Sequence, residues 1–190
     1  MASSLEKLVA APPPGATIDV AWRSFELRPK NAPPLPPDYL ARIQAARPQL
    51  YAIAREHYGL EMNPGPFGFD SRPALIGAKV AEAAGVGPAY HAAAMHAYWQ
   101  EARDLSDPAV LGALATDVGL EPAAFLAALD DPAFNAQVEA DIDLARQYGL
   151  NGVPALVFDN RYLVSGAQPL PVLTDVVERI LAEGDAADSA

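Results

Sequence analysis

The sequence contains no cysteine among its 190 residues and only three histidines. Without cysteine these residues form neither a disulfide nor a thiolate, which excludes thiolate catalysis and cysteine-based metal sites for the chain as given. His91 and His96 are five residues apart on one expected helix, which places them on different faces, and His57 belongs to another helix. We therefore expect no metal site, and no pattern in the sequence indicates another cofactor.

Positive charge and long apolar runs are also scarce. The chain carries 13 Lys and Arg against 24 Asp and Glu, a formal net charge of -11. Such a charge repels phosphate backbones and anionic lipid surfaces, so neither nucleic acid nor a membrane is an expected partner. No run of about 18 apolar residues occurs, and residues 1–15 do not follow the pattern of a signal peptide. These features lead us to expect a cytoplasmic protein.

Apolar periodicity and helix-end signals predict a long helical stretch between two short β segments. Residues 4–11 read as the last turns of a helix, and the alternating segment 17–27 (TIDVAWRSFEL) predicts a strand. Several expected helices begin with proline after an acidic residue and end at glycine. The expected helices cover residues 38–58, 73–84, 88–103, 107–118, 122–128 and 132–148. The acidic run Glu139, Asp141 and Asp143 on the last of them is interpreted as a solvated face.

The chain returns to β structure near its end. The apolar runs 155–158 and 161–164 flank Asp159 and Asn160, which both tolerate the positive φ of a tight hairpin turn. An amphipathic helix is expected at residues 169–183. The order of elements predicts an α/β fold in which a small sheet is interrupted by a helical subdomain.

Six segments of the sequence resemble one known family when they are taken in order. They are residues 22–27 (WRSFEL), 69–75 (FDSRPAL), 97–107 (AYWQEARDLSD), 147–149 (QYG), 152–154 (GVP) and 165–168 (SGAQ). The chain from residue 5 to about residue 181 resembles the DsbA-type thioredoxin-fold proteins, most closely their FrnE-like branch. The resemblance implies a thioredoxin-like α/β fold with a large inserted α-helical subdomain.

The resemblance also implies domain limits and a missing element. Residues 1–30 and 150–184 would form the thioredoxin-like domain, residues 31–149 the inserted helical subdomain, and residues 185–190 a disordered tail. Matching residues 5–8 to the end of the family's first helix places the first β-strand and the Cys-x-x-Cys motif upstream of Met1. The sequence is then either truncated or a natural cysteine-free form. We prefer truncation, because loss of a central strand leaves the strand at 17–27 without hydrogen bonds.

A binding groove is implied by the same resemblance. It would be formed by Val153, Pro154, Ser165, Gly166, Ala167 and Gln168, with a cis peptide bond between Val153 and Pro154. Proline lacks an N–H, so the backbone at Val153 can pair with an extended peptide or a thiol compound. The alternative interpretations are that Pro154 only begins a strand and that Ser165 caps the helix after Pro169. No residue of this chain is assigned a catalytic role.

Three functions are therefore considered. The first is a DsbA- or FrnE-like thiol-disulfide oxidoreductase that acts on a peptide or protein thiol and is redox-inactive as given. The second is a glutathione-binding enzyme similar to kappa-class glutathione transferases and 2-hydroxychromene-2-carboxylate isomerases. The third is a non-catalytic, chaperone-like module that binds peptides without thiols. A homodimer is also predicted, since a missing strand would expose apolar surface.

Overall fold

The computed structural model describes residues 4–27, 29 and 32–188, and side chains as far as residue 184. The chain forms two compact units. One unit combines Met1–Trp22 with Gly149–Ala190, and the other is Arg23–Tyr148. Among the described residues, no helix has the length and apolar character needed to cross a membrane.

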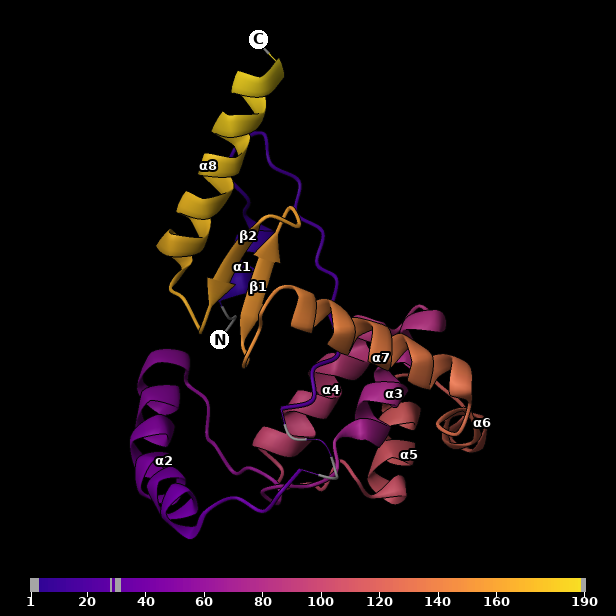
Figure 1. The fold of residues 1–190 in the computed structure, drawn as a ribbon. Coiled ribbons are helices and arrows are strands. Elements are labelled where there is room, and N and C mark those ends of the chain that lie inside the picture. The colour runs from indigo at the N-terminus through magenta and orange to yellow at the C-terminus, as the bar shows by residue number, and fades with distance from the viewer. Residues whose placement is uncertain (1–3, 28, 30–31, 189–190) are drawn as a thin grey trace. The chain divides into compact units, whose positions relative to one another are not determined.

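The first unit contains a β-hairpin and two helices (Figure 1). Its elements are α1 (Ser4–Ala10), β1 (Ala155–Phe158), β2 (Tyr162–Ser165) and α8 (Leu170–Asp188). The strands are antiparallel, in a register that runs from Ala155↔Ser165 to Phe158↔Tyr162. The structure confirms the predicted hairpin and its turn, because Asp159 and Asn160 have φ values of 49° and 52°.

Side chains from both ends of the chain form the core of this unit. Leu8 of α1 and Leu173 and Val177 of α8 are buried together, and Leu156 and Phe158 of β1 pack against them. Fully burying a leucine side chain stabilises a fold by about 1.5–3 kcal/mol, so these contacts hold α1 and α8 against one face of the hairpin. The predicted helix at 169–183 is confirmed and continues to Asp188, through part of the segment expected to be a tail.

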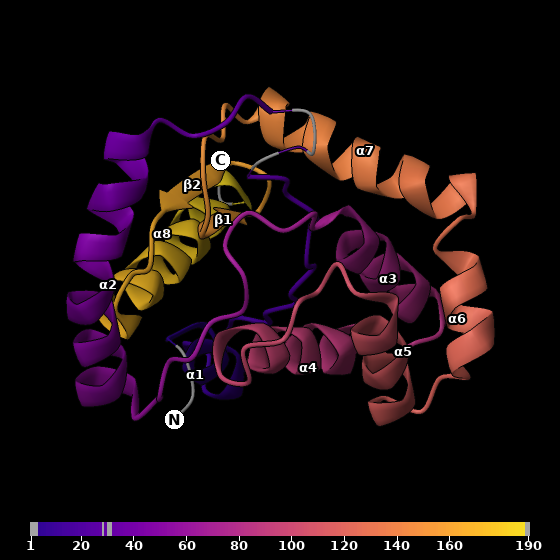
Figure 2. The same cartoon turned by 90° about the horizontal axis from the view of Figure 1, so that it is seen from below.

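Six helices make up most of the second unit (Figure 2). They are α2 (Pro37–Tyr58), α3 (Arg72–Ala83), α4 (Gly87–Trp99), α5 (Pro108–Asp117), α6 (Pro122–Ala128) and α7 (Pro132–Gln147). Helix α3 contacts α4, α5, α6 and α7, and the buried residues Tyr90, Leu111, Leu114 and Phe125 form the largest core cluster. The six expected helices of this region are confirmed.

Acidic caps set the beginnings of three of these helices. Asp107 and Asp131 accept hydrogen bonds from the backbone N–H groups of Ala109 and Ala133, both at 2.8 Å. Glu121 accepts from two backbone N–H groups at the start of α6, and these bonds hold the pKa of its carboxyl below the ordinary value. Each cap precedes a proline, which needs no hydrogen-bond acceptor in the first helical turn.

The predicted end of α4 at residue 103 is wrong, and tertiary hydrogen bonds explain the earlier end. The carbonyls of Tyr98 and Trp99 accept from the N–H groups of Gly65 and Asn63, each at 2.7 Å. These two carbonyls therefore accept tertiary hydrogen bonds and do not continue the helix. Ala102, which follows, has a φ of 57°. Such a φ is unfavourable for alanine, so the contact with residues 63–65 outweighs local preference.

The predicted strand at 17–27 is also wrong, because the described residues give this segment no neighbouring strand. Residues 17–26 are extended but have no β-ladder. The sheet of the described chain consists of β1 and β2 alone. Ser24 instead donates its backbone N–H to a carboxylate oxygen of Asp141, at 2.9 Å. A period-two pattern predicts an extended chain, but a strand also needs a hydrogen-bonding partner.

Asp141 corrects the interpretation of the acidic run on α7. Asp143 is exposed and Glu139 is half-buried, but the Asp141 side chain is only 5% exposed and lies 2.7 Å from the Lys79 ammonium, itself 4% exposed. Positions two apart on a helix lie about 200° apart, so the middle residue faces the opposite side. Arg23 also reaches Asp141, at 3.2 Å, and therefore pairs within the second unit.

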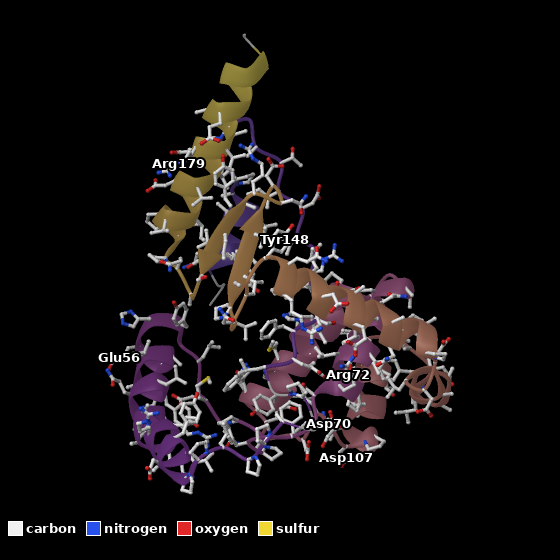
Figure 3. The ribbon with its side chains drawn as sticks, viewed as in Figure 1. Glu56, Asp70, Arg72, Asp107, Tyr148 and Arg179 are labelled. Atoms are coloured by element: carbon white, nitrogen blue, oxygen red, sulfur yellow. The ribbon has the colours of Figure 1, made fainter. Side chains whose placement is uncertain are left out.

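A second ion-pair network attaches the same extended segment to α3 and α7. Arg72, labelled in Figure 3, donates to both carboxylate oxygens of Glu26, at 2.6 and 3.0 Å, and lies 2.7 Å from Glu139. A bidentate arginine–carboxylate pair fixes both distance and orientation. The two networks therefore hold residues 23–26 against the helices without any β-ladder.

We predict that Lys79→Met lowers the free energy of unfolding by about 3 kcal/mol, because it leaves the buried Asp141 carboxylate without its closest cation. Urea denaturation measures the loss. The matched control is Arg146→Met, which breaks the exposed pair between Arg146 and Asp143 and should cost at most about 0.5 kcal/mol. Equal losses for the two variants would contradict the prediction.

We also predict an acid-sensitive contribution from Asp141. Burial opposes its ionisation, but hydrogen bonds from Lys79 and from the Ser24 backbone outweigh burial and hold the pKa below the ordinary value of 3.8. A carboxyl whose pKa is lower in the folded than in the unfolded state stabilises the fold at pH values above its unfolded pKa. This contribution is lost as the pH falls through the folded pKa. The stability difference between the wild type and Asp141→Asn should therefore shrink as the pH is lowered from about 5 to 3. Urea titrations across this range test it, and a constant difference would refute it.

Candidate functional site

A pocket of about 310 Å³ lies beside the hairpin in the first unit. One wall is the loop between α7 and β1, and the other is the end of β2 with the following turn. Its lining residues are Gly149, Leu150, Asn151, Gly152, Val153, Pro154, Leu163, Ser165 and Gly166. The two walls are joined by a backbone hydrogen bond in which the N–H of Gly166 donates to the carbonyl of Pro154, at 2.9 Å.

The turn after β2 depends on a glycine. Gly166 has a φ of 78°, a conformation that strains residues with a Cβ. Gln168 supports the turn from outside the pocket by donating its side-chain amide to the carbonyl of Ser165, at 2.9 Å. On the other wall, Asn151 donates its side-chain amide to the carbonyl of Gly149, at 3.2 Å. Both walls are therefore held by local hydrogen bonds of their own.

The structure brings together four of the six residues that the sequence indicated. Val153, Pro154, Ser165 and Gly166 line the pocket, whereas Ala167 and Gln168 are not among its lining residues. Gln168 contributes indirectly through its bond to Ser165. The peptide bond between Val153 and Pro154 is cis in this structure.

The pocket is also lined by Leu163 and the loop residues 149–152, which were not among the predicted residues. The sequence contains weak indications that these residues line a site. Gly149 and Gly152 bracket a polar segment between a helix end and a strand, a position where binding loops often occur. Leu163 alternates with Tyr162 and Val164 along β2, so the hairpin pattern alone predicts that it faces away from the core.

The pocket has an uncharged surface on which polar and apolar groups are mixed. None of its nine lining residues carries a charge, and its polar groups are backbone amides, the Ser165 hydroxyl and the Asn151 amide. Two apolar side chains are unusually open: Val153 is 57% exposed and Leu163 is 46% exposed. Exposed apolar side chains that surround a concave surface are typical of a binding site.

Backbone groups at Val153 add hydrogen-bonding capacity. Across the part of the chain that the structure describes, neither the N–H nor the C=O of Val153 has a hydrogen-bond partner. The next residue, Pro154, has no N–H, and its carbonyl is already bonded to Gly166. The arrangement therefore offers one donor, one acceptor and apolar contacts to a bound molecule. No lining residue of the pocket carries a carboxylate, an imidazole, an amine or a thiol.

Comparison with known proteins shows similarity along nearly the whole chain. A family model described as "DSBA-like thioredoxin domain" matches residues 1–178. The crystal structure of the probable DsbA oxidoreductase SCO1869 from Streptomyces coelicolor is 31% identical, with a TM-score of 0.81. The match covers 95% of this chain and 82% of that one.

Two further relatives are more distant. The uncharacterized protein YwbO of Bacillus subtilis (strain 168) is 26% identical over 175 residues, which cover 89% of this chain and 84% of that protein. A structure of 2-hydroxychromene-2-carboxylate isomerase has a TM-score of 0.67 at 21% identity, covering 84% of this chain and 76% of that one. The likeness to the isomerase supports the fold alone.

We predict that Gly166→Ala lowers the free energy of unfolding by about 1 kcal/mol, because alanine is strained at a φ of 78°. The space around Gly166 is not the cause, since the nearest atom to an added Cβ is 3.8 Å away. Gly152→Ala is the matched control: it lines the same pocket, no positive φ is found there, and an added Cβ meets nothing within 4 Å. Thermal denaturation of both variants tests the prediction, and a larger loss for Gly152→Ala would be evidence against it.

Proposed function

Because the chain belongs to the DSBA-like thioredoxin domain family, we propose that it is a FrnE-like member whose pocket binds a peptide or protein thiol. The binding residues are Val153, Pro154, Ser165 and Gly166, with Gln168 as a support and Ala167 in the same turn. The observation that carries the proposal is the uncharged pocket beside β1, with an exposed Val153 and unpaired backbone groups at its rim.

An extended peptide matches these features better than a compact ligand. Its backbone supplies the acceptor and donor that Val153 requires, as in β-augmentation. Its side chains contact Val153 and Leu163, and the Ser165 hydroxyl remains free to bond a polar atom. Burying part of two open apolar side chains favours binding by about 25 cal/mol for each Å² covered.

The redox step of a DsbA-type enzyme needs a thiolate that attacks a disulfide. None of the 190 residues supplies a thiol. We therefore assign only the binding and positioning of the substrate to these residues. The thiol pair of a complete reaction would belong to residues other than these.

A peptide-binding module without redox chemistry is the second candidate, and the uncharged, thiol-free pocket favours it. Glutathione fits less well. It carries two carboxylates and an ammonium group, and no lining residue of the pocket offers a charge to pair with them. The glutathione-binding alternative therefore ranks below both peptide-binding alternatives.

We predict that Val153→Glu weakens peptide binding by about tenfold or more, because a carboxylate must then be desolvated where an apolar contact was made. Calorimetry with a neutral ten-residue peptide that contains valine, leucine and one cysteine measures the affinity. Val172→Glu is the matched control, since Val172 is also an exposed valine but does not line the pocket. Binding by Val172→Glu should equal that of the wild type.

The same titrations separate the candidate functions. A peptide with serine in place of cysteine should bind more weakly if the site recognises a thiol, and equally if the chain is a peptide-binding module. Stoichiometric heat with glutathione but none with either peptide would favour the glutathione-binding alternative. Absence of binding for all three probes would refute the proposed function.

A further inference from the structure

Asn151 is followed by a glycine in a loop that has little internal support. Asn151 and Gly152 precede β1 in Figure 1, belong to neither a helix nor a strand, and line the pocket. Asn151 is exposed to solvent. Within the described chain, residues 150–153 make no backbone–backbone hydrogen bond. Rotation of the main chain at Asn151 therefore breaks none of the backbone bonds that hold the hairpin.

An asparagine followed by glycine can react with its own main chain. The glycine N–H loses its proton to hydroxide, and the nitrogen then attacks the side-chain amide carbon Cγ of the asparagine. A five-membered succinimide ring closes, and the side-chain nitrogen leaves as ammonia. A Cβ on the residue that supplies the nitrogen hinders the attack, and glycine has none.

Water completes the reaction by opening the ring. Cleavage of the bond between Cγ and the ring nitrogen gives aspartate. Cleavage of the bond between the main-chain carbonyl carbon and the ring nitrogen gives isoaspartate, whose main chain is one carbon longer. Either way one water is consumed and one ammonia is released, and nothing is oxidised or reduced.

The surroundings of Gly152 leave its nitrogen accessible. Its N–H has no hydrogen-bond partner within the described chain, and a Cβ added to it would meet nothing within 4 Å. The Asn151 side chain donates its amide to the carbonyl of Gly149 at 3.2 Å, a bond made by the nitrogen that leaves. Among the described residues nothing donates to the Asn151 side-chain oxygen. The carbon under attack is therefore open.

The other asparagines of the described chain have different neighbours. Asn63 precedes a proline, which has no N–H. Asn135 lies inside α7, where the next N–H belongs to the hydrogen-bonded helix. Asn160 precedes Arg161, whose N–H donates to the carbonyl of Phe158 at 2.9 Å. None of these three has an open nitrogen beside it.

We propose that Asn151 is a modification site that cyclises spontaneously with Gly152 and is converted to aspartate or isoaspartate, with water as the co-reactant. Either product brings a carboxylate into a pocket whose nine lining residues carry no charge. Isoaspartate also lengthens the main chain two residues before Val153, whose unpaired backbone groups lie at the pocket.

The new charge changes which peptides the pocket accepts. A carboxylate at position 151 attracts basic peptides and repels acidic ones. This consequence rests on the proposed function, because it requires a peptide in the pocket. The conversion itself requires only the open loop and water.

Incubation of the full chain in mildly alkaline buffer tests the conversion. Trypsin then releases residues 147–161, a peptide that contains both Asn151 and Asn160. Fragment masses locate the gain of about 1 Da that accompanies exchange of the amide for a carboxyl group. Conversion at Asn151 should be at least about tenfold faster than at Asn160, because its neighbour is an unbonded glycine. The rate should rise with pH, since the attacking nitrogen must first lose its proton.

A synthetic peptide of residues 147–161 gives the rates without the fold. Asn151 of the folded chain should react at no less than about a tenth of the peptide's rate, whereas Asn160 should fall below that fraction. Gly152→Ala is the matched variant and should slow conversion at position 151 by about tenfold, because it adds a Cβ to the attacking residue. The comparison with Asn160 in the wild type remains decisive if this variant does not fold.

Three outcomes overturn the conversion. They are no mass gain at Asn151 in the folded chain, a rate there below about a tenth of the peptide's rate, and an unchanged rate in folded Gly152→Ala.

Calorimetry with two peptides, one carrying lysines and one carrying glutamates, tests the effect on ligands. Conversion should shift the ratio of the two affinities at least about twofold toward the lysine peptide. An unchanged ratio after complete conversion refutes the effect on ligands alone. Failure of both peptides to bind the unconverted chain counts against the proposed function, and the masses still decide the conversion.

Discussion

Every backbone N–H and C=O that leaves water needs a partner, and this requirement explains the main features of the first unit. The hairpin satisfies it between β1 and β2, and α1 and α8 satisfy it internally. Residues 17–21 have the side-chain pattern of a strand, but among the described residues no strand pairs with them, so they form no β-ladder. Ser24, just beyond this segment, satisfies its backbone N–H differently, by donating it to the buried carboxylate of Asp141. Within the described chain the N–H and C=O of Val153, at the pocket, have no such partner.

Helices and turns were predictable where their signals are local. The acidic caps Asp107 and Asp131 precede prolines, and both helix starts agree with the sequence to within one residue. The hairpin turn is equally local, since it depends on Asp159 and Asn160 alone. The end of α4 was not predictable, because it depends on hydrogen bonds from residues 63 and 65. The same is true of Asp141, whose partner Lys79 lies on another helix.

The site was predictable in part, for a similar reason. The family resemblance indicated the segments 152–154 and 165–168, and the match along residues 1–178 confirms the thioredoxin-like fold that it implied. The helical insertion is seen as the second unit. The depth and lining of the pocket depend on how the loop at 149–152 turns toward Leu163. No spacing in the sequence encodes that approach. The absence of cysteine is visible in the sequence, and these residues therefore supply no thiol.

The hydrogen bond between Ser24 and Asp141 has a topological consequence. It joins residues 117 positions apart, near the points where the chain enters and leaves the helical unit. The entropic cost of closing a loop grows only with the logarithm of its length. Closing even this long loop therefore costs little more than closing a short one. This hydrogen bond thus joins segments near the two ends of the helical unit. The first unit is assembled from the two stretches of sequence that precede and follow the helical unit.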